Sequence, residues 1–323
     1  MRGRKRKGWR KVINGVNISA FFVVLFTVLP LYWLIVSSFK TPASMGDSPP
    51  QYFPNPVSGG NYSQAFVEND FGSYFIHSVI VTLSATALVL ILGTPAGYAL
   101  GRLPMRGKFT LMVMLLMISL FPEIALIAPL YSLMRTFHLL NSYQALIIPY
   151  TAFSLPFAIW ILRNYMLAIP KETEETARID GAGPIRTVWS VILPMALPGV
   201  FTAGILTFTA CWTEFLMALT LDINLKTIPV GIATFGTVFG PAYGTVFAAS
   251  VVAMVLILVL VFIFRKSVIS GLASGAVRGE HGRALALDPQ DLVPKAGMRR
   301  ADRDPRLGLV AARLPPTDTA PMP

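Results

Sequence analysis

Long runs of hydrophobic residues alternate with short polar stretches along this chain. Crossing about 30 Å of hydrocarbon takes roughly 20 apolar residues in a helix. The run VFAASVVAMVLILVLVFIF contains no charged residue and is the clearest membrane span. Six segments are long and apolar enough: Val12–Val36, Phe75–Leu100, Phe109–Leu133, Tyr143–Leu162, Leu197–Leu219 and Thr245–Phe264. The pattern predicts an all-α polytopic membrane protein with six transmembrane helices.

Prolines interrupt two of these segments. Pro122 and Pro129 lie in the third, and Pro149 and Pro156 lie in the fourth. Membrane helices tolerate proline where neighbouring helices satisfy the freed carbonyl groups, so both segments are kept as spans. The first segment is longer than the roughly 7–15 apolar residues of a signal peptide. No small-x-small cleavage site follows it, and we therefore expect a retained span.

The composition agrees with a membrane protein. Of the 323 residues, 54% are hydrophobic and only 13% are charged, whereas soluble domains have about 25% charged residues. The single cysteine excludes a disulfide within one chain, and three isolated histidines give no metal-ligand spacing. The sequence therefore predicts no metal site.

The positive charges predict the orientation of the spans. Arg and Lys residues are enriched in cytoplasmic loops. Three of those near the spans would lie outside: Lys40, Arg135 and Lys226. Sixteen would lie inside: Arg2, Arg4, Lys5, Arg6, Lys7, Arg10, Lys11, Arg102, Arg106, Lys108, Arg163, Lys171, Arg178, Arg186, Arg265 and Lys266. Both termini are thus predicted to be cytoplasmic. A net charge of +11 would suggest nucleic acid as the partner of a soluble protein, but here the distribution of the charges matters more. We expect membrane lipid and no nucleic acid among the partners.

The chain divides into three predicted regions. Residues 1–11 form a basic cytoplasmic N-terminus, and residues 12–279 form the six-span domain. Residues 280–323 contain seven basic residues, six acidic residues and seven prolines, without an aromatic residue. Such a segment lacks the apolar surface needed for a core, and we predict a disordered cytoplasmic tail.

The stretch EETARIDGAGPIRTVWSVILP (Glu174–Pro194) lies in the cytoplasmic loop between spans four and five. Acidic residues favour a helix N-terminus, glycine ends helices, and proline begins them. These rules predict a helix over Lys171–Asp180 that Pro170 begins and Gly181 ends, and a second helix that starts at Gly183-Pro184. The first is too short to be stable alone, since isolated helices need about 12–15 residues. We therefore expect this helix to pack against something else: lipid headgroups, its own bundle or a cytoplasmic partner.

This loop resembles the one found in permease subunits of ATP-binding-cassette importers. That pattern reads Glu-Ala-Ala, three residues, Gly, and later an apolar residue followed by Leu-Pro. The chain has Glu175-Thr176-Ala177, Gly181 and Ile192-Leu193-Pro194, and departs from the pattern at Thr176. Asp180-Gly181-Ala182 is similar to the carbohydrate-uptake branch, which includes maltose permeases. TPAGYALGRLPMRGK, PPQYFPNPVSGGNYSQAF and GLASGAVRG extend the resemblance over residues 9–279.

The resemblance implies a non-catalytic transport subunit of a prokaryotic cell membrane. Such a subunit pairs with a second homologous permease above a dimeric ATP-binding-cassette ATPase, and an extracytoplasmic solute-binding protein delivers a sugar or oligosaccharide. The loop at about 165–195 would couple to the ATPase through 171–194. Its expected contact residues are Glu175, Thr176, Ala177, Asp180 and Gly181. The chain contains no G-x-x-x-x-G-K-[ST] motif. We therefore expect no cofactor in this chain, with ATP and magnesium bound by the partner ATPase.

Two acidic residues and one aromatic residue in the spans are candidates for the substrate pathway. Glu123 lies near the middle of span three, and Trp212 and Glu214 lie in the outer part of span five. A charge inside a span usually faces a cavity. Carboxylates bind sugar hydroxyls, and aromatic rings pack on sugar C–H faces. Alternatively, Glu123 pairs with the partner subunit, Glu214 reaches the outer interface, and Trp212 is an interfacial anchor.

The sequence leaves three other functions to compare with this one. An ion-coupled secondary transporter predicts internal repeats and ionisable residues at the midplane, and we find no clear repeat. A membrane-embedded enzyme needs clustered catalytic side chains, which the sequence does not show. A permease of the same superfamily for glycerol phosphate would favour cationic residues in the spans. No Lys or Arg is central in any span, which favours a neutral solute.

Overall fold

The computed structural model describes residues 15–222, 224–237 and 240–284. The predicted N-terminal region 1–11 and residues 285–323 of the predicted tail lie outside the described residues. The chain divides into the units Met1–Gly271 and Leu272–Pro323. Its long helices are α1 (Gly15–Ser38), α3 (Phe71–Arg102), α4 (Lys108–Ser119), α5 (Glu123–Thr136), α6 (Tyr143–Ala168), α9 (Leu193–Thr213) and α12 (Tyr243–Ala284), which continues into the second unit.

Shorter elements connect these helices. Before α3 lie the helical turns η1 (Ala43–Gly46), α2 (Gly60–Ser63) and η2 (Gln64–Glu68). Between α6 and α9 lie α7 (Glu172–Ile179), α8 (Pro184–Thr187) and η3 (Val188–Ile192). Between α9 and α12 lie α10 (Leu216–Leu221), α11 (Ile228–Ala233) and the paired two-residue strands β1 (Gly236–Thr237) and β2 (Gly240–Pro241). The all-α fold predicted from the sequence is confirmed, and the strands add only this one short antiparallel pair among the described residues.

Five described helices are long and apolar enough to cross a membrane, and α4 with α5 adds a sixth if the pair is one span. The third predicted span, Phe109–Leu133, corresponds to two helices, α4 and α5, which meet at a bend of 87°. Pro122 stands at this bend, where it supplies no N–H and disfavours the helical conformation at the residue before it. Pro149 and Pro156 instead lie inside the continuous helix α6.

The fifth predicted span also differs from the structure. A continuous helical run begins at Pro184, passes through α8 and η3, and ends at Thr213 rather than at Leu219. The second helix of the cytoplasmic loop is thus the start of this span and not a separate element. Glu214 lies in the break, and its carboxylate accepts hydrogen bonds from the N–H groups of Met217 and Ala218. These bonds begin α10 as a new helix, which explains why α9 ends early.

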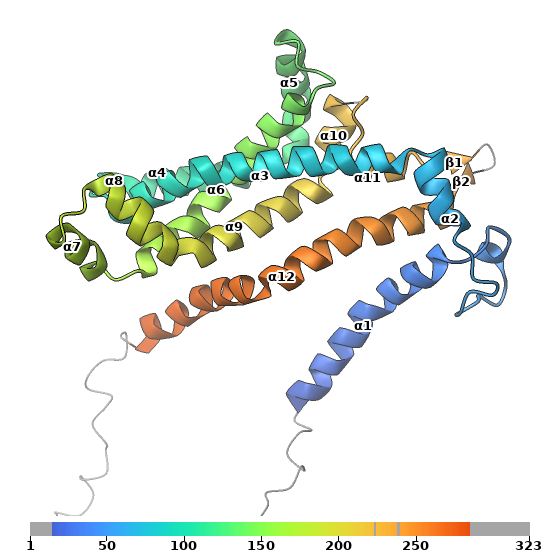
Figure 1. Cartoon of the computed structure of the whole chain (residues 1–323), viewed down its shortest axis with the longest axis horizontal. Helices are drawn as coiled ribbons and strands as arrows, with labels where there is room; N and C mark the ends of the chain where they lie inside the picture. The colour runs from blue at the N-terminus through green and yellow to red at the C-terminus, as the bar shows by residue number, and fades with distance from the viewer. Residues whose placement is uncertain (1–14, 223, 238–239, 285–323) are drawn as a thin grey trace, which may run out of the picture. The chain divides into compact units, whose positions relative to one another are not determined.

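Helices α3, α6 and α9 pack together along their lengths, and α4 packs beside α6 (Figure 1). Three glycines spaced by four residues, Gly93, Gly97 and Gly101, line the side of α3 that contacts α6. A Cβ atom at Gly97 would lie 2.8 Å from the Leu162 Cβ atom and 3.1 Å from the backbone nitrogen of Arg163. Small residues let two membrane helices approach closely, so α3 and α6 form a tightly packed pair.

Loops predicted to share a side of the membrane contact one another. The backbone N–H of Asn141, between α5 and α6, donates to the Leu221 carbonyl beyond α9 at 3.2 Å. At the same end, the Ile228 N–H donates to the Ser78 hydroxyl oxygen at 2.7 Å. At the other end, α7 and α8 lie beyond the bundle, away from α11 (Figure 1). Successive spans that cross the membrane in alternating directions would place these two sets of loops at opposite ends of the bundle, as observed.

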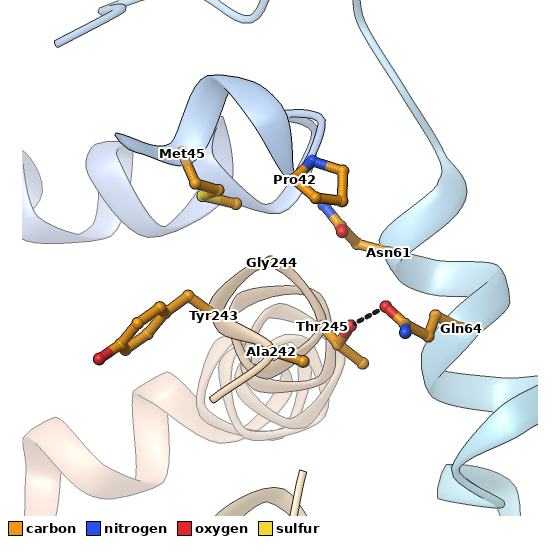
Figure 2. Close-up of a pocket in the computed structure, with 8 residues that line it drawn as sticks. All are labelled: Pro42, Met45, Asn61, Gln64, Ala242, Tyr243, Gly244 and Thr245. Atoms are coloured by element: carbon orange, nitrogen blue, oxygen red, sulfur yellow. Dashed lines mark hydrogen bonds between the residues drawn. The ribbon is translucent and has the colours of Figure 1, made fainter. Parts of the chain in front are cut away.

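The loop between α1 and α3 is ordered around Asn61. The buried side-chain amide of Asn61 donates to the Ser38 carbonyl at 2.9 Å and to the Lys40 carbonyl at 2.7 Å. Asn61 also lines a pocket of about 220 Å³ between this loop and the start of α12 (Figure 2). Across this pocket the Thr245 hydroxyl donates to Gln64 Oε1 at 2.6 Å. These bonds join the loop to both α1 and α12.

Candidate coupling surface and solute pathway

The end of α7 is closed by a Schellman motif, the hydrogen-bonding pattern that ends many helices at a left-handed residue. Gly181 has a φ of +82°, and its N–H donates to the Arg178 carbonyl at 3.0 Å. The N–H of Ala182 donates to the Ala177 carbonyl at 2.9 Å. The two bonds satisfy carbonyls that lack partners at the end of a helix. The sequence correctly predicted that Gly181 ends the helix, but α7 begins at Glu172, so Pro170 is not its first residue.

An ion pair holds α7 against α3. Arg102, the last residue of α3, places its Nε 3.2 Å from Glu174 Oε1, and the two side chains are 4% and 13% exposed. The Arg102 guanidinium also donates to the carbonyl of Ile169 at the end of α6. Arg102 therefore joins α3, the end of α6 and α7. The sequence predicted only that Arg102 lies on the cytoplasmic side and did not predict this pairing, because the two residues are far apart in the chain.

The sequence-predicted contact residues of α7 lie on different sides of the helix. Glu175, Thr176 and Asp180 are exposed, whereas Ala177 is buried against the chain itself. The Thr176 hydroxyl donates to the Glu172 carbonyl at 2.8 Å, so threonine at this position leaves the helix intact. Among these residues, the exposed ones are those in a position to meet another protein.

Three large apolar side chains lie exposed in the same loop. Ile179 is 86% exposed, Ile185 is 76% exposed and Trp189 is 66% exposed. Ile185 and Trp189 lie four residues apart, the spacing of one helix face, whereas Ile179 stands among polar residues. We name the exposed set Glu175, Ile179, Ile185 and Trp189 the coupling surface. Large apolar side chains exposed in one loop indicate a candidate interaction site.

Glu214 is fully engaged in local structure. Its Oε2 accepts a hydrogen bond from the Tyr150 hydroxyl at 2.6 Å and another from the Ala218 N–H at 3.1 Å. Its Oε1 accepts from the Met217 N–H at 2.8 Å. The carboxylate thus joins α6 to the start of α10.

Trp212 does not share a site with Glu214. Its side chain is only 3% exposed and stacks on Phe208, with ring centroids 5.5 Å apart. Phe75 packs edge-on against it at 5.7 Å. The indole ring therefore lies in an aromatic cluster between α3 and α9.

Glu123 lies at a pocket. It is the first residue of α5, directly after the bend, and its side chain is exposed. The pocket has a volume of about 530 Å³. Its lining comes from the α4–α5 bend, α6 and α9 and consists of Leu116, Ser119, Leu120, Glu123, Phe153, Ser154, Phe157, Trp160, Leu206, Thr207 and Ala210. We name it the α6 pocket. Its aromatic residues were not identified from the sequence, because aromatic residues are common in membrane helices.

The fold is similar to that of a solved transporter. A chain of a bacterial ABC transporter that imports the acidic polysaccharide alginate superposes with a TM-score of 0.65 at 21% identity. The alignment covers 77% of this chain and 94% of that chain. At this level of identity the similarity concerns the fold.

Sequence relatives cover most of the chain. The sulfoquinovosyl glycerol transport system permease protein SmoH of Agrobacterium fabrum is 37% identical, over 81% of this chain and 93% of the relative. The trehalose/maltose permease protein MalG of Thermococcus litoralis is 34% identical, over 81% and 96%. The trehalose permease protein SugB of Mycobacterium tuberculosis is 36% identical, over 80% and 94%.

The profile of one protein family matches the part of the sequence that forms most of the bundle. The profile, described as binding-protein-dependent transport system inner membrane component, matches residues 93–270. This range includes the end of α3, the α4–α5 bend, the α6 pocket, the coupling surface and most of α12. The chain is therefore a multi-pass membrane protein that belongs to the family of permease components of binding-protein-dependent ABC importers.

Proposed function

We propose that this chain forms half of the translocation pathway of an ATP-driven importer for a sugar or oligosaccharide. A second, homologous permease supplies the other half. A dimeric ATPase binds ATP and magnesium on the cytoplasmic side, and an extracytoplasmic solute-binding protein delivers the solute. Both termini of this chain lie in the cytoplasm. The relatives SmoH, MalG and SugB, which are named for sulfoquinovosyl glycerol, trehalose or maltose transport, support this class of solute.

The observation that best supports coupling to an ATPase is the exposed face of the loop between α6 and α9. Ile179, Ile185 and Trp189 lie exposed in the same loop as Glu175, although apolar side chains of this size are favoured in protected positions. The loop is also held to the bundle by Arg102 and Glu174. A partner that moves this surface would therefore move the ends of α3 and α6 with it. Rigid-body movement of this kind transmits a power stroke.

The experiment is reconstitution of the importer in lipid vesicles. This chain is purified with its second permease and ATPase, and its solute-binding protein is added with trehalose, maltose or sulfoquinovosyl glycerol. We expect the loaded binding protein to stimulate ATP hydrolysis and the vesicles to accumulate at least one of these solutes. A complex that assembles but neither hydrolyses ATP faster nor accumulates any of the three would contradict the proposal.

The coupling surface is tested by Trp189→Asp in the same system. A charge placed in an apolar interface is costly to bury, so we expect the ATPase to be lost during purification and stimulated hydrolysis to fall at least about tenfold. The matched control is Phe53→Asp, which changes an aromatic residue that is 75% exposed in the loop between α1 and α3. The control should assemble normally. Equal assembly of both variants would exclude Trp189 from the docking face.

A further inference from the structure

The loop that follows α1 folds back along the C-terminal part of that helix. The Tyr32 hydroxyl donates to the Tyr52 carbonyl at 2.6 Å, and the Phe53 ring packs edge-on against the Tyr32 ring, with centroids 6.3 Å apart. The Tyr52 ring packs edge-on against Trp33, at 6.2 Å. We name Tyr32, Trp33, Tyr52 and Phe53 the loop aromatic cluster. These contacts fix the middle of the loop against the side of α1.

The loop aromatic cluster lies beside the apolar length of α1 rather than beyond it. The apolar run of the first span ends at Val36, so Tyr32 and Trp33 lie about 4–6 Å inside it at the helical rise of 1.5 Å per residue. By contrast, the Ser58 N–H donates to the Phe39 carbonyl at 2.8 Å, after α1 has ended. The base of the loop therefore lies beyond the helix, while its middle lies at the depth where α1 leaves the hydrocarbon.

The outer side of this cluster is uncovered within the chain. Phe53 is 75% exposed, and Tyr52 and Tyr32 are exposed as well. Phe26 and Leu29 lie one to two turns closer to the membrane centre on α1, and both are also exposed. The loop aromatic cluster therefore continues the apolar surface that α1 presents along its length.

The polar groups of the loop suit a poorly hydrated position. Residues 49–56 read PPQYFPNP, and their four prolines have no N–H group that needs a partner. The Tyr52 carbonyl has its partner in the Tyr32 hydroxyl. Asp47, the only acidic residue between Lys40 and Asn61, accepts a hydrogen bond from the Gln51 side chain at 2.7 Å. Because unpaired polar groups are costly away from water, this loop loses less than an ordinary one at a membrane interface.

Depth and composition together identify the partner as lipid. Tyrosine and tryptophan are enriched where membrane helices meet the headgroups, because their rings are apolar and their polar tips stay hydrated. A water-soluble protein approaches from beyond Ser58 and not at the depth of Tyr32. We propose that the loop aromatic cluster binds phospholipid, with the Tyr52 and Phe53 rings inserted at the boundary between headgroups and acyl chains. In the predicted orientation this is the outer leaflet.

The inference goes beyond the proposed transport function and does not depend on the solute. Its test uses the assembled importer in phospholipid vesicles. Phe53→Cys is labelled with a thiol-reactive, polarity-sensitive dye. Quenching of the dye is measured with a phospholipid that carries a nitroxide near the top of its acyl chain, and separately with iodide in the water. We expect blue-shifted emission, with quenching by the lipid severalfold stronger than quenching by iodide.

The matched control is Val57→Cys. Val57 is 71% exposed in the same loop, but it precedes Ser58, which is bonded beyond the end of α1. A dye at Val57 should therefore emit as in water and be quenched mainly by iodide. The unsubstituted importer measures background labelling. Equal iodide quenching at Phe53 and Val57 would overturn the inference.

Two other outcomes would also overturn it. If the emission of the dye at Phe53 became blue-shifted only after the solute-binding protein was added, the surface would belong to that protein. If lipid quenching were present in vesicles that contain this chain alone and were lost in the assembled importer, the surface would be covered by the second permease. An importer that carries no solute would contradict the proposed function but not this inference, because the dye reports only the surroundings of the loop.

Discussion

At the scale of single residues, Gly181 is required by backbone geometry rather than by contacts. Its φ of +82° is strained for a residue with a side chain, although no atom lies near the position of a Cβ atom. We expect Gly181→Ser to cost about 1–2 kcal/mol locally and to loosen the Schellman motif. Because α7 would then lose its fixed end, stimulated ATP hydrolysis and uptake should fall severalfold while the amount of protein in the membrane stays normal.

Gly183 provides the matched control for this substitution. It also has open space around the position of a Cβ atom, but its φ is −68°, which serine adopts easily. Serine is moreover a favoured residue at the start of a helix. Gly183→Ser should therefore couple like wild type. If both variants behaved alike, side-chain bulk and not the left-handed backbone would explain any loss at Gly181.

Single-residue predictions from the sequence succeeded where local rules apply. The stop at Gly181 and the helix start at Pro184 follow from the preferences of glycine and proline, and the structure confirms both. The different surroundings of Glu123 and Glu214 were not predictable. Both are acidic residues in apolar runs, and only the packing of Tyr150 and α10 around Glu214 distinguishes them.

At the scale of elements, an ion pair between Arg102 and Glu174 joins α3 to α7. Removing either Arg102 or Glu174 leaves the other charge in a poorly hydrated site, which is costly. Arg102→Ala and Glu174→Ala should each lower stimulated hydrolysis and uptake. The loss of activity in the double variant should be smaller than the sum of the losses in the two single variants. Each single variant already removes the interaction between the two residues, so the double variant loses that interaction only once. The measurement is a double-mutant cycle on the assembled importer, with thermal unfolding as a second readout.

Glu172 supplies the control for this cycle. It lies in the same first turn of α7 but is exposed. Surface charges of this kind contribute at most about 1 kcal/mol, so Glu172→Ala should leave coupling close to wild type. Strictly additive effects of the Arg102 and Glu174 substitutions would show that the two residues act independently, which the distance of 3.2 Å argues against.

The long apolar runs identified the long helices but not how they end or bend. α3, α6 and α12 are found where the apolar runs predicted them, although each extends beyond the predicted bounds. The bend at Pro122 and the end of α9 at Thr213 were missed, while Pro149 and Pro156 leave α6 continuous. Whether a proline bends a helix depends on the tertiary contacts that replace the lost hydrogen bond. Those contacts are not visible in a local pattern.

At the scale of the whole molecule, the bundle separates two sets of loops, and their sides of the membrane remain a prediction from charge. The sixteen inside charges against three outside place Val57 in an external loop and Ile185 in the cytoplasm. Both side chains are well exposed, at 71% and 76%. Each can therefore be replaced by cysteine and probed with a maleimide that does not cross membranes.

The labelling is performed on spheroplasts that express this chain without its ATPase, so that nothing covers Ile185. We expect Val57→Cys to react in intact spheroplasts and Ile185→Cys to react only after the membrane is permeabilised. The unsubstituted chain measures the background, because its single cysteine, Cys211, is 6% exposed within α9. If Ile185→Cys reacted in intact spheroplasts and Val57→Cys did not, the orientation of the chain would be the opposite of the predicted one. The coupling surface would then face away from any cytoplasmic ATPase, so this experiment tests the orientation on which the proposed docking depends.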